Sequence, residues 1–194
     1  MKKTILFATL MILSTWIFAQ TTWNADPVHS NVKFTVTHMV ISQVDGTFKT
    51  FNGTLVQKNP DFTGSDIDFT VDVNSISTDN DMRDKHLKSD DFFNAEKYPQ
   101  MTFKSVVFKK VSGNKYELLG KLTIRDVTKN VKFDVIYGGT VKDAMGKTRA
   151  GFRASTTINR LEYGLKWNAM TEAGGAVVSS DVDIHLNLEF VQAK

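Results

Sequence analysis

Hydrophobic and polar residues alternate along eight stretches of the chain. Between residues 182 and 190, every even position is apolar and every odd position is polar or charged. A period of two residues is typical of a β-strand that buries one face, because successive side chains point to opposite sides of a sheet. The pattern predicts antiparallel strands with one apolar face. The eight stretches are residues 32–38, 51–55, 67–73, 101–107, 116–124, 131–137, 152–158 and 182–190.

Glycine-containing signals between the stretches predict tight turns. Four of them stand out in the sequence: Asp45-Gly46, Ser112-Gly113-Asn114, Gly138-Gly139 and Met145-Gly146. Glycine adopts the positive φ angles that such connections require, and Asn and Asp also favour turns. We therefore expect these four positions to connect strands.

Residues 78–99 do not follow the strand rhythm. Met82, Arg83, His86 and Leu87 recur at helical spacing, and Thr78-Asp79 offers a helix cap. We expect a short helical segment near residues 79–97, after which Pro99 returns the chain to a strand.

Eight strands with one apolar face either close into a barrel or pack as two sheets, because an open sheet of this size leaves long unpaired edges. A barrel of about eight strands is nearly filled by side chains or holds one small ligand. These two interiors imply different functions. A filled barrel would be a structural or interaction module, whereas a hollow barrel would carry an apolar molecule.

The N-terminus reads as a secretory signal peptide over residues 1–19. A basic start, Met1-Lys2-Lys3, precedes an almost wholly apolar stretch over residues 5–18 and a small residue, Ala19. The stretch is too short for a membrane-spanning helix. We expect cleavage after Ala19 or Gln20, a periplasmic or secreted protein, and a single domain over residues 20–194.

Composition narrows the possible chemistry. Without Lys2 and Lys3 the chain has 22 basic and 21 acidic residues, so its charge does not favour nucleic acid or a membrane surface. The chain has no cysteine, which excludes disulfides, thiolate metal sites and a cysteine nucleophile. The four histidines show no zinc-binding spacing, and no phosphate loop or dinucleotide motif is present, so the sequence indicates neither a metal nor a cofactor.

A few polar or small residues fall on the inward face. His38 is the strongly polar one, and it is either a hydrogen-bonded core residue or a group that orients a ligand head. Small inward residues hint at space that large neighbours do not fill, although small residues also serve close packing. These are Gly53, Ser105, Gly120 and Ala154.

The segment over residues 82–87 has the most chemistry-like cluster. A histidine close to an acid, His86 and Asp84, suggests a general base. A solvated, ion-paired helix face explains the same residues, because such networks imitate active sites. Arg83 would be able to receive a phosphate or carboxylate at the mouth of the barrel.

Several motifs follow one another along residues 23–191 and form a recognisable set. They include Asp26-Pro27-Val28-His29-Ser30, Val32-Lys33-Phe34-Thr35-Val36-Thr37-His38, Arg83-Asp84-Lys85-His86-Leu87, Tyr98-Pro99-Gln100-Met101-Thr102-Phe103, Asn159-Arg160 and Tyr163-Gly164-Leu165. This set resembles the YceI-like family of bacterial polyisoprenoid-binding, lipocalin-like proteins. The resemblance implies an all-β, extended eight-stranded antiparallel barrel with a helical segment near one end. It also implies export and a long apolar tunnel for an isoprenoid, quinone-like or fatty amphiphile.

We therefore predict a lipid-binding barrel that is not an enzyme. Its partner is an isoprenoid or other long-chain lipid. We expect no nucleic acid and no stable membrane insertion, and a homodimer is compatible with the sequence. His38, Arg83 and His86 would meet the polar head. The predicted tunnel lining comprises Phe34, Val36, Phe69, Phe103, Leu118, Phe133, Phe152, Ala154 and Ile184. The alternatives are a lipid-modifying enzyme that uses Asp84 and His86, or a ligand-free structural or interaction barrel.

Overall fold

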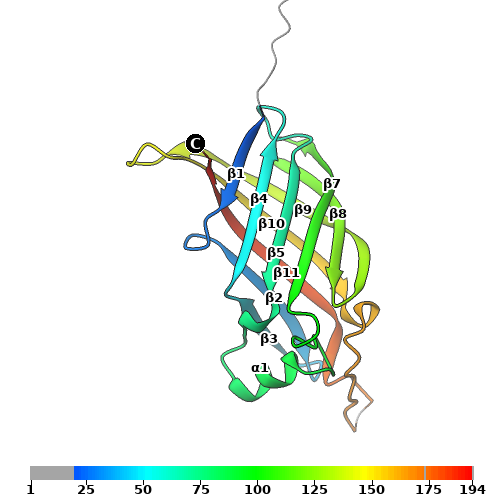
Figure 1. The fold of residues 1–194 in the computed structure, drawn as a ribbon. Coiled ribbons are helices and arrows are strands. Elements are labelled where there is room, and N and C mark those ends of the chain that lie inside the picture. Colours follow the sequence, from blue (N-terminus) through cyan, green and yellow to red (C-terminus); the bar gives the residue numbers. More distant parts are fainter. Residues whose placement is uncertain (1–19, 173, 194) are drawn as a thin grey trace, which may run out of the picture.

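The strands pair side by side into a closed antiparallel barrel (Figure 1). The computed structural model describes residues 20–172 and 174–193, so the predicted signal peptide lies outside the described residues. The strands are β1 (Thr21–Ala25), β2 (Asn31–His38), β3 (Ser42–Phe48), β4 (Phe51–Gln57), β5 (Asp66–Asp72), β6 (Ile76–Ser77), β7 (Gln100–Ser112), β8 (Lys115–Ile124), β9 (Val127–Lys142), β10 (Thr148–Asn159) and β11 (Val178–Gln192). The helices are η1 (Val73–Ser75), α1 (Asp81–Lys88) and η2 (Arg160–Tyr163), of which η1 and η2 are 3-10 helices.

These segments form the eight staves of the barrel. A stave here is one strand of the wall along its whole length, whether it is continuous or consists of two named segments. The order β1-β4-β5-β7-β8-β9-β10-β11 closes where β11 pairs with β1. Toward the other end, β2 takes the place of β1 beside β11, β3 pairs with β2, and β6 pairs with β3. Short breaks at residues 26–30, 49–50 and 73–75 interrupt three long staves. The eight-stranded antiparallel barrel is thus confirmed, and its closure removes the sheet edges.

Alternation places the expected apolar residues inside, with one exception in β7. The pairing of β7 with β8 shifts between Ser105 and Val107. The inserted residue, Val106, reverses the alternation, because a β-bulge puts two residues opposite one. Phe108 is consequently 3% exposed and Val107 is 39% exposed. The prediction that Val107 faces inward is therefore wrong.

Two of the four predicted turns lie inside strands. Asp45-Gly46 belongs to β3, and Gly138-Gly139 belongs to β9 beside the register shift at residues 151–152 of β10. The connection from β2 to β3 instead runs through Met39 and Val40, which have φ angles of 50° and 67°. The turns at residues 112–114 and 145–146 are confirmed.

Aromatic side chains close one end of the barrel. Phe62, in the loop between β4 and β5, is 3% exposed and packs against Trp23 and Phe152, with ring centroids 5.4 and 5.3 Å apart, respectively. The Tyr116 hydroxyl donates to the backbone carbonyl of Asp61 at 2.8 Å and ties this loop to β8. This loop therefore covers one end of the barrel, opposite the end that carries α1 (Figure 1).

The helix α1 lies at that opposite end, the lower end in Figure 1. Asn80, rather than Thr78 or Asp79, caps it by accepting a hydrogen bond from the Arg83 backbone N–H at 2.9 Å. The helix ends at Lys88, short of the predicted residue 97, because Ser89 has extended backbone and residues 90–97 form turns. Among the described residues, no helix has the length and apolar content needed to cross a membrane.

Candidate binding site

Two adjoining cavities occupy the barrel interior. The inner chamber, next to the aromatic end, has a volume of about 130 Å³, and the outer chamber, next to α1, has a volume of about 270 Å³. Five side chains line both chambers, so the two cavities adjoin, and we refer to the pair as the tunnel. These side chains are Phe34, Phe48, Met101, Ile124 and Ile184.

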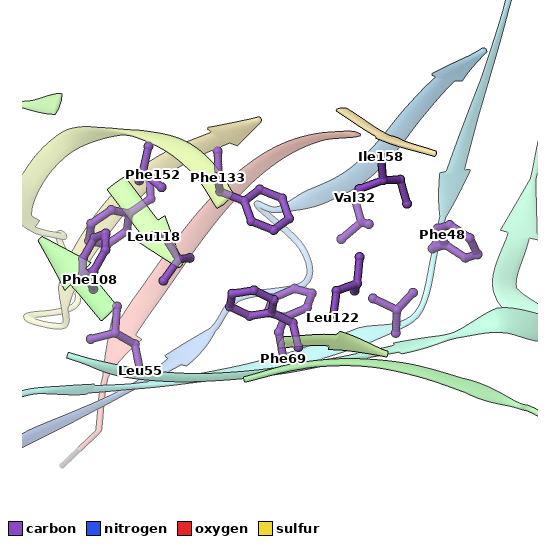
Figure 2. Close-up of a cluster of buried hydrophobic side chains, with 14 of the residues drawn as sticks. Val32, Phe48, Leu55, Phe69, Phe108, Leu118, Leu122, Phe133, Phe152 and Ile158 are labelled. Carbon is purple, nitrogen blue, oxygen red and sulfur yellow. The ribbon is translucent and has the colours of Figure 1, made fainter. Parts of the chain in front are cut away.

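The inner chamber is apolar. Figure 2 shows the rings of Phe69 and Phe133 pointing into the space between the strands, with Leu118 and Phe152 further along. Its lining among the described residues is apolar apart from two exposed residues, Lys33 and Thr102. A cavity with such walls holds hydrocarbon in preference to water, because it offers water too few hydrogen-bond partners.

Phenylalanine rings pack over glycines on neighbouring strands. A Cβ atom added to Gly53 would approach the Phe69 ring to 2.5 Å, and one added to Gly120 would overlap the Phe103 ring. The hint that small residues at these two positions leave space unfilled is therefore wrong. The rings occupy that space, and their remaining faces line the inner chamber.

The outer chamber combines apolar walls with cationic groups. Its lining includes two guanidinium groups, on Arg83 and Arg160, and two imidazoles, on His38 and His86. No aspartate or glutamate among the described residues lines it. Water exclusion strengthens electrostatic interactions with any polar group that enters, because the local dielectric is low.

His38 lies at the end of β2, half-buried, with its side chain on the outer chamber. The His38 ring makes no hydrogen bond to any described residue. The described residues therefore do not support the interpretation of His38 as a hydrogen-bonded core residue. The ring nitrogens remain available to a molecule in the chamber.

The Arg83, Asp84 and His86 side chains have separate partners. Arg83 donates to the Thr78 hydroxyl at 2.7 Å and to its carbonyl at 2.6 Å, while Asp84 accepts from the Thr78 hydroxyl at 2.5 Å. His86 pairs instead with Asp91 at 2.8 Å. The predicted Asp84–His86 pair therefore does not form a hydrogen bond, and Asp84 serves to hold the start of α1.

An aromatic cluster surrounds His86. Its ring lies edge-on to Phe92 and Trp167, with centroids 5.1 and 5.5 Å away. Trp167 belongs to the segment after η2, so this cluster joins α1 to a part of the chain about 80 residues later. It forms one wall of the outer chamber.

Arg160 is a site residue that pattern reasoning did not single out. It is 3% exposed, and it follows Ile158 at inward parity on the extension of β10. Its guanidinium donates to the carbonyls of Ser179, Leu165, Trp167 and Val178, at 2.8, 2.9, 2.7 and 3.1 Å. Burial lowers the pKa of Arg160. The feature of the sequence that would have identified Arg160 was its inward parity.

A second ionic cluster lies outside the tunnel. Asp26, His29 and Glu189 bring ligand-type atoms within 4.8 Å of one another. Arg149 already donates to Asp26 at 2.7 Å and to Glu189 at 2.5 Å, and Asp143 accepts from its Nε at 2.7 Å. The cluster is thus an ion-pair network that joins the segment after β1 to β10 and β11.

The twelve residues predicted as binding residues all line the tunnel. The inner chamber includes Phe34, Phe69, Phe103, Leu118, Phe133, Phe152, Ala154 and Ile184. The outer chamber includes Phe34, Val36, His38, Arg83, His86 and Ile184. Their contact with a ligand stays a prediction.

A closed antiparallel barrel with an apolar interior and a polar mouth defines the class of lipocalin-like barrels. The model of the YceI-like domain matches residues 23–190, and the chain belongs to that family. A UPF0312 protein of Staphylococcus epidermidis is 39% identical over 171 residues, which are 88% of this chain and 97% of that protein. A UPF0312 protein of Staphylococcus aureus is 36% identical over the same shares.

Solved structures share the fold. The Campylobacter jejuni YCEI protein is 30% identical, with a TM-score of 0.70 over 81% of this chain and 90% of that chain. A polyisoprenoid binding domain from Saccharophagus degradans is 16% identical, with a TM-score of 0.64 over 88% of this chain and 98% of that chain. At that identity the second likeness concerns the fold alone.

Proposed function

We propose that the protein binds one long amphiphile, a polyisoprenoid, an isoprenoid quinone or a fatty-acid-like lipid, inside the barrel. The observation that carries this proposal is the pair of adjoining chambers, of which the inner is apolar and the outer is lined by two guanidinium groups and two imidazoles. The tail lies in the inner chamber and the head in the outer one. Burial of hydrocarbon contributes about 0.8 kcal/mol per methylene before the cost of ordering the chain. A polyisoprenoid binding domain among the structural neighbours is consistent with this ligand class.

The tunnel argues against a filled structural barrel. An unoccupied apolar cavity of about 130 Å³ costs about 3 kcal/mol, because its lining atoms lose packing contacts. A bound lipid restores those contacts and stabilises the fold.

Gentle purification, organic extraction and mass spectrometry test this proposal. We expect about one lipid per protein, and delipidated protein should rebind prenyl lipids with a rise in melting temperature. A protein that is purified empty and also rejects prenyl and fatty lipids would rule the proposal out.

The same proposal treats the protein as a carrier rather than an enzyme. Asp84 and His86 hold different partners, so the acid–base pair that the sequence suggested does not form; the His86 ring is held by Asp91 instead. We expect no product after long incubation with a bound isoprenoid pyrophosphate. Turnover that disappears in His86→Ala while lipid binding survives would establish an enzyme instead.

We propose further that the protein acts after export. The basic start and the apolar stretch over residues 5–18 support this. N-terminal sequencing of the protein from a secreting host should give Gln20 or Thr21 as the first residue, and an intact Met1 would contradict export by cleavage.

A further inference from the structure

Arg160 carries a buried positive charge that no described carboxylate neutralises. Its side chain lies against the outer chamber, 3% exposed, with Cζ 5.8 Å from the centroid of the Phe92 ring. Two partly buried guanidinium groups differ: Arg125 pairs with Asp90, and Arg149 pairs with three carboxylates. Buried charges are normally paired, since removal from water is costly.

The hydrogen bonds of Arg160 leave one donor over. A guanidinium has five N–H groups, and four of them reach carbonyl oxygens within the described chain. The fifth, on Nη2, has no described acceptor. Three of the four carbonyl residues, Leu165, Trp167 and Val178, line the outer chamber themselves, so the guanidinium is held at its wall.

Arg83 supplies a second guanidinium at the same chamber; this residue is exposed, and no described carboxylate pairs with it. Thr78 accepts from its Nε and from Nη2, and its Nη1 group has no described partner. Two nearby acids are engaged elsewhere, Asp84 with Thr78 and Asp91 with His86, and no described acid lines the chamber. The lining therefore has an excess of positive charge and of N–H donors.

We propose that the outer chamber selects amphiphiles with an oxyanion head group, a phosphate or a carboxylate, which accepts hydrogen bonds from Arg160 and Arg83. This inference rests on the proposed lipid-binding function and specifies its ligand class. Planar guanidinium groups match both oxyanions, and charge-assisted hydrogen bonds are about twice as strong as neutral ones. The anion also compensates the buried charge, which an alcohol or a quinone carbonyl cannot do.

Tail-matched ligands test the inference in the purified, delipidated protein. Farnesyl phosphate is compared with farnesol, and palmitate with hexadecanol, by the change in tryptophan fluorescence, since Trp167 lines the outer chamber. At least one anion should bind about tenfold or more tightly than its alcohol, which corresponds to about 1.4 kcal/mol. A preference for both anions, or for phosphate or carboxylate alone, supports the inference and identifies the head group.

Substitutions of the two arginines test whether they cause the preference for the anionic ligand. Arg160→Gln and Arg83→Gln should each lose most of the preference for the anion while farnesol binds as before. Arg153→Gln is the control, because Arg153 lies exposed on the outer face of β10. If Arg160→Gln fails to fold, because it loses bonds to four carbonyls, the wild-type comparison and Arg83→Gln still decide.

The failures are distinguishable. Equal affinity for anion and alcohol, or an undiminished preference in both glutamine variants, overturns the oxyanion head group and leaves lipid binding intact. Rejection of all four ligands overturns the proposed function as well.

Discussion

The ring of Phe34 occupies the space that a side chain at Gly46 would take. The two residues are paired across β2 and β3, and a Cβ atom added to Gly46 would overlap the ring. Phe34 lines both chambers. The place of this ring at the boundary of the two chambers therefore depends on the absence of a side chain at Gly46.

Gly46→Ala should displace the Phe34 ring toward the tunnel. We expect a loss of about 1–3 kcal/mol in the free energy of unfolding, as for other overpacked sites, and a clear loss of lipid binding. Urea denaturation and lipid titration measure both quantities. Gly151→Ala is the matched control, because a Cβ atom there meets no heavy atom within 4 Å. Equal effects of the two changes would contradict the proposed role of Gly46.

Ala154→Trp should block the inner chamber. Ala154 lies between Val135 and Leu186 on adjacent strands, and its methyl group lines the cavity. The indole enters ligand space without adding charge, so we expect lost prenyl-lipid binding with near-normal melting of the delipidated protein. Arg153→Ala, on the outer face, should change neither. Lost stability with unchanged ligand content would instead place Ala154 in packed core.

Gln57→Leu should weaken the closed end of the barrel. The Trp23 indole N–H donates to Gln57 Oε1 at 2.9 Å, and both side chains are buried. Removing the acceptor leaves a buried donor unpaired, which costs about 1–3 kcal/mol. Urea unfolding of Gln57→Leu, Trp23→Phe and the double variant gives their coupling energy. Additive losses would show that the hydrogen bond contributes nothing.

Acid should destabilise the protein through Asp26. Hydrogen bonds from His29 and Arg149 hold the pKa of Asp26 well below its ordinary value of 3.8. The unfolded chain therefore binds a proton at higher pH than the folded protein does. The contribution of Asp26 to stability is complete above about pH 4 and is lost as the pH falls toward the folded pKa.

Asp26→Asn should thus lower stability at pH 7 and flatten its decline between about pH 4 and pH 2. Urea unfolding across this range measures the effect. Asp181→Asn is the control, because Asp181 is exposed and forms no ion pair with a described residue. An unchanged pH profile in Asp26→Asn would show that other carboxyl groups dominate acid unfolding.

Part of the site followed from local alternation alone. A period of two decides which side of a strand a residue occupies, so inward positions such as Phe69, Phe133 and Ala154 were predictable. Arg160 also has inward parity, but a charged side chain is ordinarily expected at the surface. Its burial depends on four carbonyl groups, the nearest five residues away and the others up to 19.

The sequence by itself determined eight of the strands, most of their apolar faces and the family, because each follows from short-range spacing or from motifs. It did not predict β1, β3 or β6. Tertiary structure alone decided the bulge at Val106, the place of Gly46 inside a strand and the end at which the tunnel closes. Gly46 resembles a turn residue until Phe34 is placed opposite it. These features depend on which side chains contact one another across the barrel. Contacts between residues far apart in the sequence produce no periodic pattern in it.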